Sequence, residues 1–424
     1  MSDTPVTYDV MFLHVHKQHI YESIAGAVEA GLKTAFVTPL YNRGLTRIFF
    51  GMMPNRVGRM VCEHEDPRLS RADIHTGFQW SLARLFVNYA WHRGDSRFFR
   101  IFDHWCARQI RFGRFRAKIF YVFQDYLPRT CLAAKDTGSL LVAEQIINNS
   151  PKAQERVLGS TGKVSFPVKC PEYPLDQSVN EQLLRLADGV VVPCSYVRDD
   201  IGGEVAAGKI WEAPYGAPET AQVGTPGYRV PASHAPSKAG APVLIAARAN
   251  TVRKGGHLLI EAFLSHSAED LFPGYSGQVN VRLLGNIDSQ FLPAIDRIHA
   301  LQPRIRITHG FIPHSLVAAA LAQADFFILP SLSESTSLAM LEAAAAGLPL
   351  VITPFCGLDD FVNGTHGILI ADTTPAAIAQ AIREMFLRRT QWTDFGRNAQ
   401  KIVSVNSWRE FSRRIGANLR SLLA

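Results

Sequence analysis

Residues 331–350, SLSESTSLAMLEAAAAGLPL, decide the fold prediction because they join two apolar runs. The preceding run, ADFFILP at 324–330, is rich in aromatic residues and ends in proline, which predicts a buried strand. LAMLEAAAA consists of strong helix formers, and Gly347 and Pro349 end that helix. LPLVIT at 348–353 predicts the next strand. The sequence therefore predicts a strand–loop–helix–strand unit of a parallel sheet.

Two carboxylates mark this unit, Glu334 at the mouth of the helix and Glu342 about one turn inside it. A helix N-terminus attracts phosphate, and the small residues Ser335, Thr336 and Ser337 let an anion approach the backbone. Since like charges repel, Glu334 is better suited to accept hydrogen bonds from sugar hydroxyls. Glu342 reaches a ribose if the helix points at a nucleotide. The structural alternative is a capping Glu334 and a solvated Glu342.

The whole stretch, with CGLDDFVNGTHGILI at 356–370, resembles the donor-site signature of retaining glycosyltransferases of the GT-B fold, family 4. That signature is a Glu, seven residues, a second Glu, an Ala-rich helix, Gly, Pro and a strand. Glu334 and Glu342 occupy both acidic positions. The resemblance implies that Glu334 touches the donor sugar and Glu342 the ribose, with the donor phosphates at the helix start formed by Ser335, Thr336, Ser337 and Leu338.

The composition is that of a globular protein. The 424 residues suggest two or three domains, and 47% are apolar and 19% charged. No uninterrupted apolar run is long enough to span a bilayer, and the N-terminus lacks the basic region of a signal peptide. The six cysteines are dispersed without paired spacing, which favours a reduced cytosolic protein. The net charge of +7 fits an anionic ligand, an anionic membrane or nucleic acid, and does not choose among them.

Alternating strand and helix patterns predict an α/β protein with two Rossmann-like parallel-sheet domains facing a cleft, the GT-B arrangement that the resemblance implies. The predicted boundaries are 1–219 for the N-terminal, acceptor-side domain and 241–404 for the donor-binding domain. Residues 220–240 are rich in Gly, Pro, Ala and Ser and predict a linker. Residues 405–424 predict a final helix, and the resemblance implies that it crosses back onto the first domain with Trp408 as an anchor.

The first predicted loop, HVHKQH, departs from the family pattern. Many family members have a Gly-Gly turn there, close to the donor phosphates, whereas this chain has His16 and Lys17, with His19 at the helix start. One hypothesis is that these cationic side chains replace backbone N–H groups as phosphate partners. The alternative is that His14 and His16 are half-buried residues at a strand end.

A second departure follows the strand AKIFYVFQ. Many members carry a His there that touches the donor sugar, but this chain has Gln124 and Asp125, either of which could contact a sugar hydroxyl. The segment EQIINNSPKAQERVLG, with Glu144 at a strand end, is another candidate for the cleft.

Residues 42–116 mix arginine with large apolar residues and predict a helical insertion in the first domain. We favour helices whose Phe side chains face the core and whose Arg side chains are solvated. The leading functional alternative is a peripheral membrane patch, and the others are an acceptor-binding wall or stacking on single-stranded nucleic acid.

Two cations follow the first strand of the second domain, APVLIAAR. Arg248 ends that strand, and Lys254 precedes Gly255 in the loop, with Arg253 as the nearby alternative. Fixed cations at a strand end suit a diphosphate, and the resemblance implies that Arg248 and Lys254 neutralise it as it leaves. The resemblance also places the nucleobase against Gly310, Phe311 and Ile312.

The resemblance implies transfer of a sugar from a nucleotide-diphosphate donor of the UDP or GDP type, with retained configuration, to a glycan or lipid-linked acceptor. The donor is a substrate, so no cofactor is expected. No metal is expected either, because the sequence has no Asp-x-Asp pair in a suitable loop and no His/Cys ligand cluster. The expected location is the cytoplasm or the inner membrane face. Two alternatives remain: a nucleotide-sugar epimerase of the same fold, and a non-catalytic protein that binds anions or nucleic acid.

Overall fold

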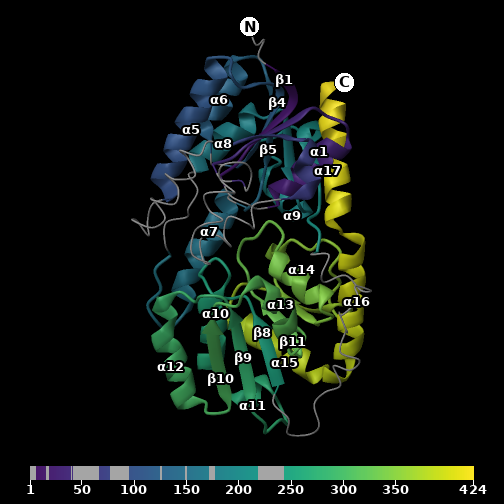
Figure 1. Ribbon diagram of the computed structural model, residues 1–424. Helices are drawn as coiled ribbons and strands as arrows, with labels where there is room; N and C mark the ends of the chain where they lie inside the picture. The colour runs from purple at the N-terminus through teal and green to yellow at the C-terminus, as the bar shows by residue number, and fades with distance from the viewer. Residues whose placement is uncertain are drawn as a thin grey trace, which may run out of the picture.

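The chain folds into two parallel-sheet domains stacked end to end, as Figure 1 shows. The computed structural model describes residues 6–15, 19–39, 41, 66–76, 95–124, 127–148, 150–170, 177–217 and 243–424. The predicted fold class is confirmed. Several predictions lie outside the described residues: His16, Lys17, Asp125, the linker 220–240, and residues 42–65 and 77–94 of the insertion.

The first domain is a seven-stranded parallel sheet in the order β3-β2-β1-β4-β5-β6-β7. Its strands read as apolar runs because helices cover both faces of such a sheet. The strands are β1 Thr7–Leu13, β2 Thr34–Val37, β3 Asp73–His75, β4 Arg116–Phe123, β5 Leu140–Glu144, β6 Gly189–Val192 and β7 Ile210–Glu212. The helices are α1 Ile20–Glu29, α5 Asp95–Arg111, α6 Pro128–Asp136, α7 Pro151–Ser160, α8 Gln177–Leu186 and α9 Ser195–Ile201.

The second domain repeats the plan with a six-stranded parallel sheet in the order β10-β9-β8-β11-β12-β13. In both sheets the order reverses beside the first strand, which is where doubly wound sheets bind ligands. The strands are β8 Val243–Ala247, β9 Val279–Leu284, β10 Ile305–Gly310, β11 Phe326–Leu329, β12 Leu350–Ile352 and β13 Gly367–Leu369. The helices are α10 Gly256–Ser265, α11 Ala268–Leu271, α12 Leu292–Leu301, α13 His314–Leu321, α14 Leu338–Ala345, α15 Pro375–Leu387 and α16 Trp392–Val405.

The last helix, α17 (Trp408–Leu423), returns to the first domain and lies against α1, at the right of Figure 1. Two glycines allow this close crossing. A Cβ on Gly416 would lie 2.3 Å from the carbonyl oxygen of Gly26, and a Cβ on Gly26 would lie 2.0 Å from that of Ser412. The helix backbones therefore touch where larger side chains would hold them apart.

Residues 150–170, which we call the crossing segment, belong to the first domain by sequence but pack against the second. Val157 and Phe166 are buried in the core of the second domain. Ser160 Oγ lies 2.9 Å from His257 Nε2, and Ser165 Oγ donates to Glu261 Oε2 at 2.8 Å. The sequence analysis did not predict α7, although Ser150 as N-cap and proline at the first helical position are the usual signals of a helix start.

Helix α5 shows the arrangement that we favoured for the arginine-rich insertion. Phe98 and Phe102 are buried in the core of the first domain, while Arg100 and Arg108 are exposed. Among the residues that the structure describes, no helix is both long enough and apolar enough to cross a bilayer.

Candidate functional site

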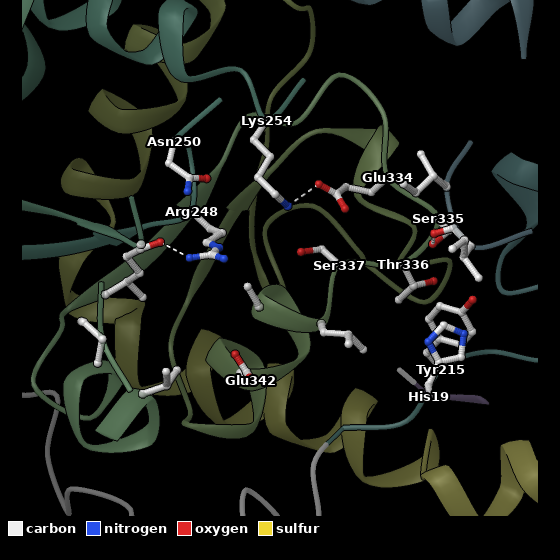
Figure 2. Close-up of a pocket in the computed structure, with 18 of the residues that line it drawn as sticks. His19, Tyr215, Arg248, Asn250, Lys254, Glu334, Ser335, Thr336, Ser337 and Glu342 are labelled. Atoms are coloured by element: carbon white, nitrogen blue, oxygen red, sulfur yellow. Dashed lines mark hydrogen bonds and ion pairs between the residues drawn. The ribbon is translucent and has the colours of Figure 1, made fainter. Parts of the chain in front are cut away.

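One cavity lies where the carboxyl ends of both sheets face each other, and Figure 2 shows it from close by. Its volume is about 890 Å³. The second domain supplies most of its wall and the first domain supplies one side. The lining residues are His19, Ile146, Ile147, Tyr215, Arg248, Asn250, Lys254, Leu284, Gly285, Asn286, Phe311, Ile312, Val317, Glu334, Ser335, Thr336, Ser337, Leu338, Ala339 and Glu342.

Arg248 and Asn250 follow β8 and hold the loop after β9. The Arg248 guanidinium donates to the carbonyl oxygen of Leu284, and Asn250 Nδ2 donates to that of Asn286 at 2.7 Å. Asn250 Oδ1 is buried and has no hydrogen-bond partner among the described residues. Both residues line the cavity, so the Arg248 guanidinium lies beside any ligand bound there.

Glu334 is the most strongly paired carboxylate of the cavity. Its Oε1 lies 2.5 Å from Lys254 Nζ and 3.1 Å from an Arg253 nitrogen, and Ser331 Oγ donates to it at 3.2 Å. Burial alone would raise the pKa of the Glu334 carboxyl, but the two cations outweigh burial and lower it to about 2. Burial lowers the pKa of Lys254, and the neighbouring carboxylate partly restores it. Arg253 therefore shares Glu334 with Lys254. Sequence reasoning named Arg253 only as an alternative to Lys254 at the diphosphate and did not predict either ion pair.

Gly255 lets Lys254 reach this position. It has a φ of +70°, and a Cβ there would lie 2.0 Å from the carbonyl oxygen of Pro330. The loop after β8 thus lies directly against the end of β11, which brings Lys254 to Glu334. Any residue larger than glycine would separate the two loops.

The N-terminus of α14 opens toward the same cavity. The Ser337 hydroxyl accepts the backbone N–H of Met340, which is the usual cap of a helix start. Leu338 and Ala339 of the first turn line the cavity, so the N–H groups of this helix start lie beside it. Glu342, one turn further on, points into the cavity (Figure 2).

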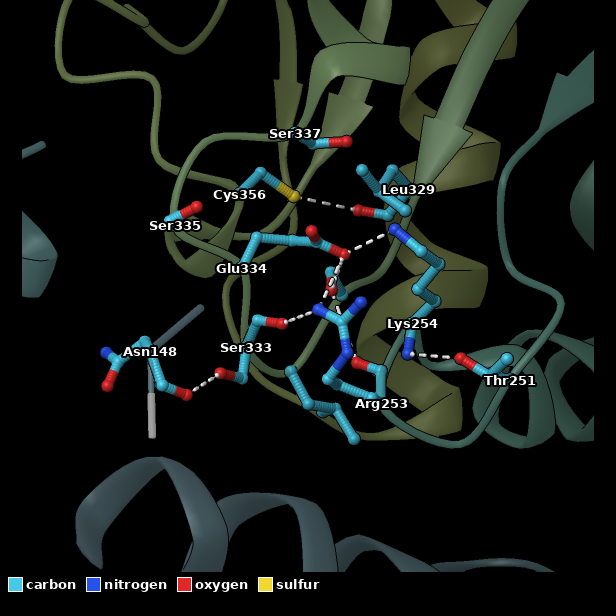
Figure 3. A network of polar contacts seen from close by, with 12 residues as sticks. Asn148, Thr251, Arg253, Lys254, Leu329, Ser333, Glu334, Ser335, Ser337 and Cys356 are labelled. Atoms are coloured by element: carbon cyan, nitrogen blue, oxygen red, sulfur yellow. Dashed lines mark hydrogen bonds and ion pairs between the residues drawn. The ribbon is translucent and has the colours of Figure 1, made fainter. Parts of the chain in front are cut away.

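The hydroxyls of the serine-rich loop bind the first domain. Ser333 Oγ donates to the carbonyl oxygen of Asn148 at 2.7 Å, and Ser335 Oγ donates to that of Ile146 at 2.6 Å. Figure 3 shows the first of these bonds beside the Glu334 cluster. In the other direction, Cys194 Sγ donates to the carbonyl oxygen of Ser335 at 2.9 Å. The shape of the loop therefore depends on both domains.

The side of the cavity formed by the first domain consists of two isoleucines and two polar rings. Ile146 and Ile147 follow β5, Tyr215 follows β7, and His19 precedes α1. His19 Nε2 lies 2.5 Å from Glu144 Oε1. Sequence reasoning mentioned His19 and Glu144 separately and missed their pairing, because 125 positions separate them and no local pattern links them.

The structure brings most of the predicted site residues to this one cavity: Arg248, Lys254, Phe311, Ile312, Glu334, Ser335, Thr336, Ser337, Leu338 and Glu342. Gly310 does not line it, because its backbone N–H and carbonyl pair with Gly285. Gln124 is buried and accepts the backbone N–H of Ile147 at 2.9 Å, so it supports the wall from behind.

Sequence reasoning missed Tyr215, Asn250 and the loop 284–286. Among the described residues, no three His, Cys, Asp or Glu side chains cluster as metal ligands.

Comparison with known proteins agrees with this geometry. Residues 241–387 match the family described as Glycosyl transferases group 1, a range that contains the whole second-domain wall of the cavity. D-inositol 3-phosphate glycosyltransferase of Geodermatophilus obscurus is 32% identical over 142 residues, which is 32% of this chain and 31% of that protein. The chain spans about a third or less of the length of the curated relatives that it matches.

Solved structures resemble the chain over nearly its whole length. Sucrose-phosphate synthase from Thermosynechococcus elongatus has a TM-score of 0.63 at 15% identity and covers 98% of this chain and 99% of its own. HepE of Anabaena, in complex with UDP and glucose, has a TM-score of 0.60 at 14% identity and covers 98% and 100%. These likenesses show the GT-B fold, and the similarity to the group 1 family is confined to residues 241–387 of the second domain.

Proposed function

We propose that the protein is a metal-independent, retaining glycosyltransferase that transfers a sugar from a nucleotide-diphosphate sugar to a glycan or lipid-linked acceptor. The observation that carries the proposal is the convergence of Arg248, Lys254, Glu334 and Glu342 on one cavity at the start of α14. Cations and helix N–H groups serve a diphosphate, whereas carboxylates serve hydroxyl groups. A ligand that engages all four of these side chains therefore carries both a diphosphate and hydroxyl groups.

In the proposed reaction the bond between the anomeric carbon and the diphosphate oxygen breaks, and an acceptor oxygen bonds to that carbon on the same face. The leaving diphosphate gains negative charge, which Arg248, Lys254 and the N–H groups of α14 stabilise. The acceptor proton passes to the leaving phosphate. Glu334 holds sugar hydroxyls and, through its ion pair, fixes the Lys254 ammonium. Glu342 accepts hydrogen bonds from the ribose.

The structural neighbours support a nucleotide sugar as donor, since HepE was solved with UDP and with UDP-glucose. The family match and the relatives named as glycosyltransferase and synthase support group transfer rather than epimerisation or simple anion binding. Membership of family 4 and a role in polysaccharide synthesis remain parts of the proposal.

A cytoplasmic or peripheral location belongs to the same proposal. The described part of α5 and the turn after it expose Arg100, Arg108 and Arg111 together with Ile101 and Phe112, which are 56% and 66% exposed. Arginine beside exposed apolar side chains suits an anionic lipid surface, where a lipid-linked acceptor would lie. Flotation with anionic and neutral vesicles tests this part separately.

The experiment that tests the donor site is a thermal-shift panel with UDP, GDP, ADP and their common sugar conjugates, on wild type and Glu342→Ala. A ligand that binds only the folded state raises the melting temperature. We expect one nucleotide to stabilise the wild type and Glu342→Ala to lose most of that shift. If no nucleotide stabilises the wild type at millimolar concentration while RNA binds in a salt-sensitive manner, the protein is not a glycosyltransferase.

A further inference from the structure

A buried carboxylate with four donors lies behind the first-domain side of the cavity. Glu144 is 0% exposed. Ser23 Oγ donates to its Oε2 at 3.1 Å, and the Tyr121 hydroxyl donates to the same oxygen. The Tyr215 hydroxyl donates to Oε1 at 3.2 Å, where His19 Nε2 also binds. Burial and then the Glu144 charge raise the pKa of Tyr121 and of Tyr215, so both hydroxyls stay protonated and keep donating.

The four donors come from three separate parts of the chain, namely α1 with the residue before it, β4, and the segment after β7. Burying a carboxylate is costly unless every lone pair is satisfied, and here each oxygen has two partners. An apolar residue would fill the same space without such a requirement. The arrangement is therefore better explained by what Glu144 holds than by the stability that it adds.

What Glu144 holds is the ring of His19. The ring stacks with Phe123 and with Trp408, at centroid distances of 5.0 and 5.8 Å, and the Tyr215 ring centroid lies 4.3 Å away. Its side chain is 10% exposed and lines the cavity. Since Nε2 binds Glu144, Nδ1 is the remaining polar atom, and the described residues give it no hydrogen-bond partner. The ring is thus fixed in orientation, and within the described part of the chain Nδ1 is the nitrogen open to a ligand.

The position of His19 within the cavity indicates which part of a ligand it meets. Figure 2 shows Arg248 and Asn250 on one side of the cavity and His19 with Tyr215 on the opposite side, with Ser337 between them. Phosphates held by the cations and the start of α14 would occupy the middle. The group attached beyond the phosphates then extends toward His19.

Resting on the proposed function, we propose that His19 is a specificity-determining residue that binds a hydroxyl of the transferred sugar through Nδ1, and that Glu144 is its positioning residue. A hydroxyl is the fitting group because it both donates and accepts. When Nε2–H donates to Glu144, Nδ1 of the neutral ring is an acceptor and Nδ1 of the protonated ring is a donor. A hydroxyl can form a hydrogen bond with Nδ1 in either state. A phosphate oxygen, which only accepts hydrogen bonds, can bind Nδ1 only when the ring is protonated.

The test compares each nucleotide with its own sugar conjugate, so that the sugar is the only difference. Dissociation constants are measured by calorimetry for UDP and UDP-glucose, GDP and GDP-mannose, and ADP and ADP-glucose. For the pair that the wild type prefers, we expect His19→Ala to weaken binding of the conjugate by about 3- to 10-fold and to leave the free nucleotide unchanged, as one lost hydrogen bond predicts. His19→Gln, which keeps a donor and an acceptor, should recover part of the loss.

Glu144→Gln keeps the volume of the buried side chain and removes its charge. We expect it to reduce the same sugar-dependent difference, because the ring loses its fixed partner. If this variant does not fold, the two His19 variants still decide, since that side chain is partly exposed. The matched control is His104→Ala on α5, an exposed histidine outside the cavity, which should change neither constant.

The outcomes separate this inference from the proposed function. If the wild type binds no nucleotide, the proposed function fails first. If the wild type binds nucleotides and His19→Ala weakens nucleotide and conjugate equally, His19 contacts the phosphates or only supports the wall, and the sugar assignment is wrong. An unchanged conjugate affinity in His19→Ala, or a wild type that never prefers a conjugate over its nucleotide, would also overturn it.

Discussion

The Lys254 ammonium lies 2.5 Å from the Glu334 carboxylate, and this ion pair joins the loop after β8 to the loop after β11. Both side chains line the cavity, so the pair shapes the site and is also nearly buried. A buried pair of this kind holds geometry at the cost of desolvation, and removing one partner leaves the other charge uncompensated. We therefore expect the loss of this ion pair, by mutation or by low pH, to change both the stability of the protein and its affinity for the donor.

The first prediction concerns acid stability. The pKa of Glu334 is about 2 in the folded protein against an ordinary value of 4.5. A lowered carboxyl pKa stabilises the folded state above pH 4.5, and that contribution is lost as the pH falls toward 2. At neutral pH the lowered pKa of Glu334 contributes on the order of 3 kcal/mol to the free energy of unfolding. Denaturant unfolding of wild type and Glu334→Gln between pH 2.5 and 7 should give curves that diverge as pH rises. Parallel curves would show that the ion pair does not titrate in this way.

The second prediction separates phosphate binding from nucleoside binding. Lys254→Met removes the ammonium and keeps the length of the side chain. We expect it to weaken UDP, or whichever nucleoside diphosphate binds, by at least about 10-fold, since charge-assisted hydrogen bonds are the strong ones. The affinity for the nucleoside alone should not change. Calorimetry measures both, and Lys401→Met on the exposed face of α16 is the matched control. An equal loss for nucleoside and diphosphate would contradict a phosphate role.

The sequence predicted the second domain well because its information is local. Buried strands appear as apolar runs, and the interval from Glu334 to Glu342 spans one loop and one helix start. Arg248 and Lys254 follow a strand whose end must face the cavity in a parallel sheet. The cavity lining is therefore largely what the motif indicated, with Gly310 as an exception because its backbone pairs with Gly285.

The first domain was harder to predict because its contribution depends on contacts distant in sequence. Glu144 meets His19 across 125 positions, and Ser335 meets Ile146 across 189. Such pairs leave no periodic pattern in the chain. The crossing segment was missed for the same reason, since its partners in the second domain follow it by about a hundred positions or more.

The third prediction concerns Arg156 of the crossing segment. One of its nitrogens donates to the carbonyl oxygen of Leu332 at 2.8 Å and to Tyr196 Oη at 2.8 Å, and its guanidinium lies 3.5 Å from the ring centre of Phe355. Leu332 lies in the loop that carries Glu334. We expect Arg156→Ala to reduce donor turnover about 10-fold and to increase amide exchange in residues 331–337, because the loop loses a donor from the first domain.

Two variants sharpen this test. Arg156→Lys keeps the charge but loses the planar stacking, and should recover only part of the turnover. Arg198→Ala on α9 removes a half-buried arginine that pairs with Asp199 and Glu212 on the surface, and should change little. If Arg156→Ala left exchange in residues 331–337 unchanged, the loop would be shaped by the second domain alone.

The fourth prediction uses two helical glycines that differ in their surroundings. A Cβ on Gly416 of α17 would lie 2.3 Å from the carbonyl oxygen of Gly26, a backbone atom of the packed helix α1. A Cβ on Gly159 of α7 would meet nothing within 4 Å. Replacing glycine by alanine in a helix gains up to about 1 kcal/mol of helix propensity, while forced overpacking costs about 1–3 kcal/mol. The two effects oppose each other only at Gly416.

Gly416→Ala should therefore lower the melting temperature, whereas Gly159→Ala should leave it unchanged or raise it slightly. Because α17 carries Trp408, which stacks on His19, the shifted helix should also weaken binding of the preferred nucleotide sugar. Calorimetric unfolding and a binding isotherm measure the two effects on the same samples. If Gly416→Ala were as stable as Gly159→Ala, α17 could move away from α1 at no cost, and the crossing at Gly26 would not fix the position of Trp408 at the cavity.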